Sequence, residues 1–165
     1  MLQEIPKEEN GLVNSANGLS FEEYREWLKR KYAESEQVGL VDGWKVPSTT
    51  YWLYADGKPV GFGTIRHFLT DALREAGGNI GYGIAPEYRG KGYGKALLGL
   101  LLEEAGRLGM DRALVTIRSD NAASKAVALA NGGVITGQAG ERILVWLDTA
   151  QKAADPSDSA FRNGD

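Results

Sequence analysis

The residues best suited to chemistry lie in a short glycine-rich, cationic segment, Arg89-Gly90-Lys91-Gly92-Tyr93-Gly94-Lys95. A strand pattern over Ile80–Ile84 precedes it, and a leucine-rich helix pattern follows over residues 96–105. The start of a helix offers unpaired backbone N–H groups and the positive end of the helix dipole. Glycines let a bulky anion approach the main chain, so the pattern predicts a phosphate-binding site.

Two familiar phosphate loops do not match this segment. A dinucleotide fingerprint would need glycine or alanine at position 95, which is lysine. A Walker A loop would need glycine at 89 and serine or threonine at 96, where the chain has Arg89 and Ala96. The pattern that fits is Arg-x-x-Gly-x-Gly, formed by Arg89, Gly92 and Gly94.

With this loop placed between a strand and a helix, the chain resembles the GNAT acyltransferase superfamily. A second matching element, Asn121-Ala122-Ala123-Ser124, follows the apolar run at residues 113–117, which reads as a buried strand. The resemblance extends over about residues 50–147. It implies an α/β fold (α+β by some schemes): a mixed central sheet of about six to seven strands flanked by helices. The strand carrying Ile84 would bulge, and the parallel central strands would splay apart.

The resemblance also implies that acetyl-CoA is the co-substrate, in a slot between the splayed strands. The backbone of the loop would hold its pyrophosphate, and the main chain of Ile84 and Ala85 would meet the acetyl group and the pantetheine arm. Asn121 and Ser124 would meet the same arm, although Asp120 or Asn121 could equally act as a plain helix cap. The loop residues assigned to the pyrophosphate are Arg89, Gly90, Lys91, Gly92, Tyr93, Gly94 and Lys95.

Direct acetyl transfer to an amine needs a base for the substrate ammonium and an acid for the departing thiolate. Many GNAT enzymes supply the acid from a tyrosine seven residues after the asparagine, but here that position is Ala128. The candidates for the base are His67, Glu75 and Glu87. Water could protonate the thiolate, and Tyr82 is a further candidate catalytic residue. The segment from Arg66 to Tyr82 also resembles an uncharacterised bacterial-type GNAT subgroup in which position 79 is often histidine, whereas this chain has Asn79.

The resulting hypothesis is an N-acetyltransferase that acts on a primary amine of a small molecule or protein. The alternative is a non-catalytic acyl-CoA-binding sensor or interaction module, which the missing tyrosine would favour. The net charge of −3 argues against nucleic-acid binding, and the absence of cysteine with a single histidine argues against a metal site. We expect no membrane segment, a cytoplasmic location and, from related folds, a possible homodimer.

Local signals predict the elements around the site. A capping box at Ser20 and Glu23 begins a helix that ends near residue 34, and a loop containing Trp44 follows. Asp56-Gly57 joins two strands, Thr70 caps a short helix, and a final hairpin covers about residues 134–147. No strand is predicted in residues 1–18. We expect a single domain over residues 1–148 and a polar, flexible tail over residues 149–165.

Overall fold

The structure, a computed structural model, describes residues 1–36 and 45–149. Trp44 and residues 150–165 of the expected tail therefore lie outside the described residues. In chain order the elements are β1 (Glu8–Glu9), β2 (Leu12–Val13), α1 (Phe21–Glu36), β3 (Ser48–Ala55), β4 (Lys58–Arg66), α2 (Asp71–Glu75), β5 (Ile80–Ile84), a 3-10 turn (Pro86–Tyr88), α3 (Tyr93–Arg107), β6 (Arg112–Arg118), α4 (Ala122–Ala130), β7 (Val134–Ala139) and β8 (Arg142–Asp148).

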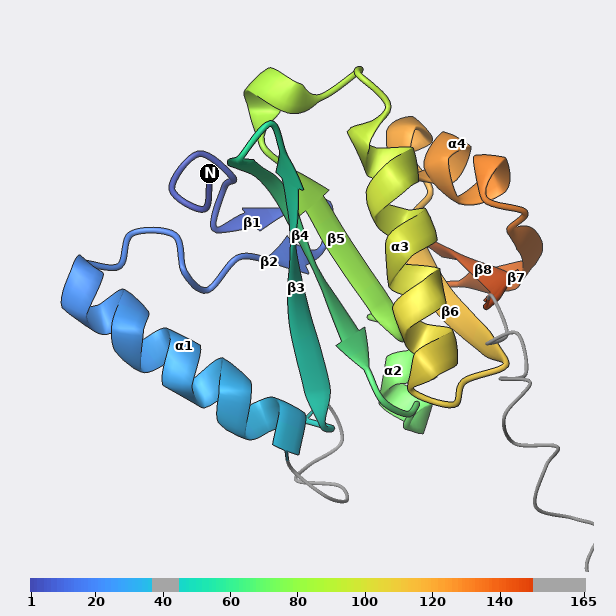
Figure 1. Ribbon diagram of the computed structural model, residues 1–165. Coiled ribbons are helices and arrows are strands. Elements are labelled where there is room, and N and C mark those ends of the chain that lie inside the picture. Colours follow the sequence, from blue (N-terminus) through green and yellow to red (C-terminus); the bar gives the residue numbers. More distant parts are fainter. Residues whose placement is uncertain (37–44, 150–165) are drawn as a thin grey trace, which may run out of the picture.

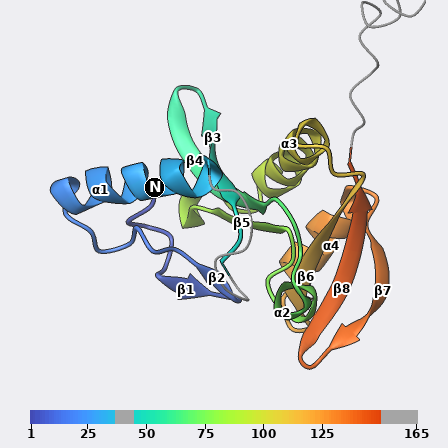
Figure 2. The ribbon, with the colours of Figure 1, turned by 90° about the horizontal axis from the view of Figure 1, so that it is seen from below.

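The main strands form two three-stranded antiparallel sheets, in the orders β3-β4-β5 and β6-β8-β7. The central strands β5 and β6 run in the same direction but belong to different sheets (Figure 1). Seen from below, α1 and the β1–β2 hairpin lie on the side of the first sheet, and α4 lies on the side of the second (Figure 2). This arrangement is the expected α/β fold with splayed central strands.

The two sheets meet at the start of β5. Asn79 donates its N–H to the Leu114 carbonyl of β6 at 2.7 Å, and Leu114 donates back to the Asn79 side-chain oxygen at 2.9 Å. Beyond this junction β5 remains paired only with β4, in a continuous register from Ile80 to Ile84. The expected bulge in β5 is therefore wrong, because the splay arises from the loss of pairing with β6 rather than from an extra residue.

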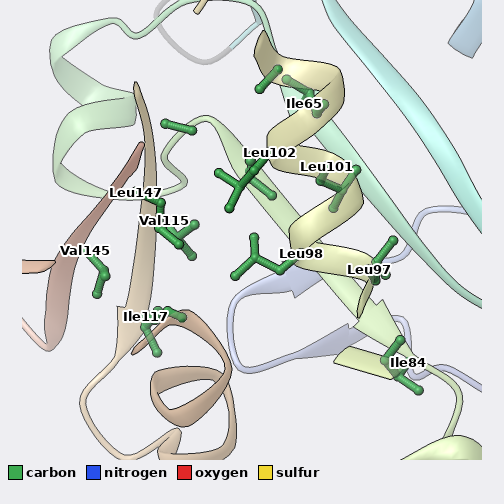
Figure 3. Packing of buried hydrophobic residues seen from close by; sticks show 14 residues of the cluster. Ile65, Ile84, Leu97, Leu98, Leu101, Leu102, Val115, Ile117, Val145 and Leu147 are labelled. Atoms are coloured by element: carbon green, nitrogen blue, oxygen red, sulfur yellow. The ribbon is translucent and has the colours of Figure 1, made fainter. Parts of the chain in front are cut away.

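Helix α3 packs across the divide between the sheets. Its leucines Leu97, Leu98, Leu101 and Leu102 are buried against side chains from both sheets, such as Ile65 of β4, Ile84 of β5, and Val115 and Ile117 of β6 (Figure 3). Each buried leucine contributes about 1.5–3 kcal/mol relative to an exposed one. One helix therefore holds two sheets that share little backbone hydrogen bonding.

Residues 1–18, where the sequence pattern predicts no strand, contain a short hairpin in which β1 pairs with β2. Each strand has only two residues, which is too short for a periodic pattern. The hairpin has a packing role, because Leu12 covers β5 at Gly83. A Cβ built on Gly83 would lie 2.6 Å from a Leu12 methyl carbon. The bare glycine face of β5 therefore accommodates a leucine from the hairpin.

The local signals elsewhere are confirmed. Ser20 and Glu23 exchange the two hydrogen bonds of a capping box, and the Thr70 side chain accepts from Leu73 N–H to cap α2. Asp56 and Gly57 both have positive φ, as the tight hairpin turn requires. Thr149, expected in the tail, is instead buried, and its N–H bonds to the Asp111 carbonyl at 3.0 Å.

Candidate active site

A cavity of about 970 Å³ extends through the divide between the sheets. One part is lined by the glycine-rich loop and the start of α4, including Gly90, Gly92, Asn121 and Ser124. Another part is lined by β4, α1 and the β1–β2 hairpin. The cavity therefore has two differently lined parts, and β5 lines it as well, which suits a reaction between two substrates. We name them the loop wing and the β4 wing.

The backbone of the loop wing is free to bind an anion. Among contacts within the described residues, none of the six N–H groups from Gly90 to Lys95 donates a hydrogen bond. Gly90 and Gly92 have φ values of 72° and 85°, where glycine is the favoured residue. These donors surround the N-terminus of α3, so the loop fits the pyrophosphate of a coenzyme A molecule.

Arg89 does not offer its backbone N–H to the pyrophosphate, although the resemblance implied that it would. Its N–H is bonded to the Pro86 carbonyl at 3.2 Å, so this group is occupied. Its Nε donates to the Ile84 carbonyl at 3.0 Å, and its two terminal nitrogens bind the Glu9 carboxylate at 3.0 and 2.6 Å. Arg89 therefore fastens the loop to the end of β5 and to the β1–β2 hairpin.

The edge of β5 that faces β6 presents main-chain groups to the cavity. Arg66 N–H bonds to the Asn79 carbonyl and Ala85 N–H to the Val60 carbonyl, so alternate residues starting at Asn79 pair with β4. By that alternation the N–H groups of Tyr82 and Ile84 point away from β4, toward the divide. The Ile84 N–H thus suits its predicted role of meeting the acetyl group, whereas the Ala85 N–H is already bonded to β4. The Tyr82 N–H is a further candidate for that role, which only the register of the strands reveals.

Helix α4 brings its N-terminus to the same divide. The Asn121 side-chain oxygen accepts from Ser124 N–H at 3.1 Å, so Asn121 caps the helix as the plain interpretation predicted. Its amide nitrogen donates no hydrogen bond to the described residues and remains available to a ligand. The Ser124 hydroxyl lies 3.1 Å from the Tyr82 hydroxyl. Burial raises the pKa of Tyr82, opposed by the Ser124 hydrogen bond, so the phenol is protonated at neutral pH.

The other candidate side chains lie apart from this constellation. Ala128 is fully buried in the core and does not line the cavity. His67, Glu75 and Glu87 also lie outside the cavity lining. The His67 ring nitrogen Nε2 lies 2.9 Å from the Thr49 hydroxyl, and Glu75 and Glu87 are exposed. Of the four proposed catalytic residues, Tyr82 alone lines the cavity within the described part of the chain.

The β4 wing contains residues that the sequence reasoning did not assign to a site. Phe62, Thr64 and Arg66 line it from alternate positions of β4. Alternation in β4 could have indicated that these three side chains share a face. Which face meets the cavity depends on β5 and on the β1–β2 hairpin, and no sequence signal identified that packing.

Comparison with known proteins identifies the class. Residues 17–132 match the acetyltransferase (GNAT) family. An L-methionine sulfoximine/L-methionine sulfone acetyltransferase from Salmonella typhimurium is 32% identical over 139 residues, covering 82% of this chain and 71% of that protein. The chain belongs to the GNAT acetyltransferase family. By that membership it is an acetyl-CoA-dependent N-acetyltransferase, with acetyl-CoA as co-substrate.

Solved structures agree on the fold. The yncA protein from Salmonella typhimurium, determined with its cofactor acetyl-CoA, has a TM-score of 0.55 and 20% identity, covering 84% of this chain and 79% of that one. Mycobacterium smegmatis RimJ in complex with CoA-disulfide has a TM-score of 0.59 and 22% identity, covering 84% and 69%. At these identities the likeness concerns the fold.

Two further properties of the described residues bear on the site. Residues 1–36 and 45–149 contain no group of three or more histidine or acidic side chains that could hold a metal ion. Over the same ranges no helix is long and apolar enough to cross a membrane.

Proposed function

We propose that the protein transfers the acetyl group of acetyl-CoA directly to the primary amine of a small molecule, with the coenzyme in the loop wing and the amine in the β4 wing. The observation that carries this proposal is a set of six backbone N–H groups, from Gly90 to Lys95, that donate to no described residue and lie beside the cavity. A cavity lined by both apolar and charged side chains suits a small acceptor better than a folded protein surface.

In this proposal the C–S bond of the thioester breaks as the N–C bond of the amide forms. The amine loses one proton, and the thiolate gains one. The Tyr82 and Ile84 N–H groups are oriented to donate to the acetyl oxygen, where negative charge develops during the transfer. Asn121 donates its free amide N–H to the pantetheine arm, and Ser124 holds the Tyr82 hydroxyl.

Tyr82 is the proton donor for the thiolate in this scheme. Its raised pKa keeps the hydroxyl protonated at neutral pH, and it lies beside the start of α4, close to the residues proposed to bind the arm. The phenol that relatives place on α4 would thus come from β5 in this chain. The proton on the substrate ammonium leaves to water, because the proposed bases His67, Glu75 and Glu87 lie outside the cavity lining.

The test is acetyl-CoA turnover, measured by thiol release and by mass spectrometry of the product, against a panel of small amines and peptides. L-methionine sulfone and L-methionine sulfoximine are the first acceptors to test, because the Salmonella relative is named for them. N-acetylation of a small amine by the wild type, but not by a Gly92→Val variant that remains folded, is the expected result. Thiol release that no panel member stimulates would contradict the proposal.

A further inference from the structure

The β4 wing contains a partly buried cation, Arg66, that has no carboxylate partner among the described residues. Arg66 lines the cavity, and burial lowers the pKa of its guanidinium, which nevertheless stays protonated at neutral pH. Its Nη1 donates to the Gly77 and Gly78 carbonyls, both at 3.1 Å. Its Nε and Nη2 donate to no described residue, and no described carboxylate forms an ion pair with it.

The cavity as a whole has an excess of positive charge in a chain whose net charge is −3. Among the described residues that line it, seven are cationic and two are acidic. Both carboxylates are already paired, Glu9 with Arg89 at 2.6 Å and Glu34 with Lys31 at 2.5 Å. The cationic residues are Arg30, Lys31, Lys45, Arg66, Arg89, Lys95 and Arg142.

The position of Arg66 separates it from the coenzyme phosphates. The proposed pyrophosphate site lies beyond the C-terminal end of β5, after Ile84. Arg66 lies opposite Asn79, at the other end of β5, where the two sheets are joined. Five strand residues separate the two ends, which corresponds to roughly 16 Å. Arg66 is therefore placed to meet the acceptor rather than the phosphates.

A guanidinium that is partly withdrawn from water gains from an anionic partner, and no described carboxylate supplies one to Arg66. Its Nε and Nη2 form the edge that binds a carboxylate through two parallel hydrogen bonds. We propose that the acceptor is a primary amine that also carries a carboxylate, as an amino acid does, and that Arg66 binds this carboxylate. The inference rests on the proposed N-acetyltransferase function and narrows its substrate class.

The experiment compares matched acceptors that differ only in the carboxylate. The pairs are L-methionine sulfone with 3-(methylsulfonyl)propylamine, and the common L-amino acids with their decarboxylated amines. We expect the best acceptor to carry a carboxylate and its decarboxylated partner to have a kcat/KM lower by roughly 10- to 100-fold, since hydrogen bonds to charged groups have that effect. Equal kcat/KM within the pairs would overturn the inference.

Variants of Arg66 test whether this residue causes the preference for a carboxylate-bearing acceptor. Arg66→Gln should raise KM for the carboxylate-bearing acceptor by roughly 10- to 100-fold, leave kcat within a few-fold and abolish the preference within each pair. Arg66→Lys should retain part of the preference, because it keeps the charge without the two-pronged geometry. Arg74→Gln, an exposed change on α2 outside the cavity, is the matched control. A preference that survives in folded Arg66→Gln would overturn the assignment.

A binding measurement separates this inference from the proposed function. Calorimetric titration of each pair into CoA-saturated protein requires no turnover. If the carboxylate-bearing compounds bind more tightly than their partners in the wild type but not in Arg66→Gln, and none of them is acetylated, the carboxylate inference is supported. The same result would contradict the transferase proposal. If turnover occurs but no carboxylate-bearing compound binds better than its partner, the transferase proposal stands and this inference is overturned.

Discussion

Asn79 and Leu114 exchange two hydrogen bonds, one from the Asn79 main chain and one returned to the Asn79 side chain. The side-chain amide also donates to the Arg66 carbonyl at 3.1 Å. Asn79 is only 4% exposed, and the bond that it accepts from the Leu114 N–H is buried, whereas its bond to the Arg66 carbonyl is partly buried. One amide therefore joins the two sheets at the point from which they diverge.

Asn79→Ala should destabilise the fold, because it leaves the Leu114 N–H and the Arg66 carbonyl buried without partners. Each unsatisfied group costs about 1–3 kcal/mol. Asn79→Asp keeps an acceptor for the Leu114 N–H, but it loses the donor to the Arg66 carbonyl and buries a charge, so it should not restore the lost stability. Urea denaturation measures the free energy of unfolding. A value for Asn79→Ala within about 0.5 kcal/mol of wild type would show that the junction does not depend on this side chain.

Gly92→Ala should weaken CoA binding beyond its effect on folding. Gly92 and Gly109 both have a φ of 85° and open space where a Cβ would lie, so alanine costs each a similar backbone strain of about 1–2 kcal/mol. Gly109 follows α3 and lies outside the cavity, which makes Gly109→Ala the matched control. Thermal melts with and without CoA provide the comparison. Equal CoA-dependent shifts in the two variants would contradict the loop assignment.

Asn121→Asp should separate the capping role from the binding role. Aspartate keeps the oxygen that accepts from Ser124 N–H, so the melting temperature should change little. It replaces the free amide donor with an acceptor, and CoA affinity should fall by about 1–3 kcal/mol, roughly 5- to 150-fold. Calorimetric titration of CoA gives the affinity. Unchanged affinity with reduced stability would mean that Asn121 is a helix cap alone.

Tyr82→Phe should lower kcat and change its pH dependence. Burial holds the pKa of Tyr82 above its ordinary value, so the phenol loses its proton only at a pH above about 10. If it protonates the thiolate, the wild-type kcat falls at that alkaline limit, and the fall is absent in the phenylalanine variant. Tyr93→Phe, in the loop, should retain the fall. Identical profiles for wild type and Tyr82→Phe would indicate that water protonates the thiolate.

His67 should affect the pH dependence of stability more than that of catalysis. Burial lowers its pKa, so as pH falls below about 6.5 the unfolded chain takes up a proton before the folded chain does. The contribution of His67 to stability is thus present above about pH 6.5 and lost as pH falls through the lowered pKa. His67→Gln should remove this part of the acid destabilisation and keep most of the wild-type kcat. A large loss of kcat at constant stability would instead identify His67 as the base.

The sequence predicted the parts of the site whose geometry is determined by a few consecutive residues. Gly92 and Asn121 belong to short motifs whose geometry depends on their own backbone, so their positions followed from spacing. Leu12 and Arg66 act through partners more than ten residues away, and no local pattern marks such contacts. In the sequence Asn79 is notable only because the GNAT subgroup that this segment resembles often has histidine at that position. Its buried bonds to Leu114, 35 positions along the chain, depend on a junction between sheets that only the folded chain displays.

The packing of Leu12 on Gly83 has an evolutionary consequence. The wall of the β4 wing comes largely from α1, β4 and the N-terminal hairpin, whereas the coenzyme side comes from residues after Tyr82. The proposed acceptor and coenzyme sites are thus encoded in largely separate stretches of the chain. Mutations in the N-terminal stretch should therefore be able to alter which amine enters without changing the loop that is proposed to hold the coenzyme.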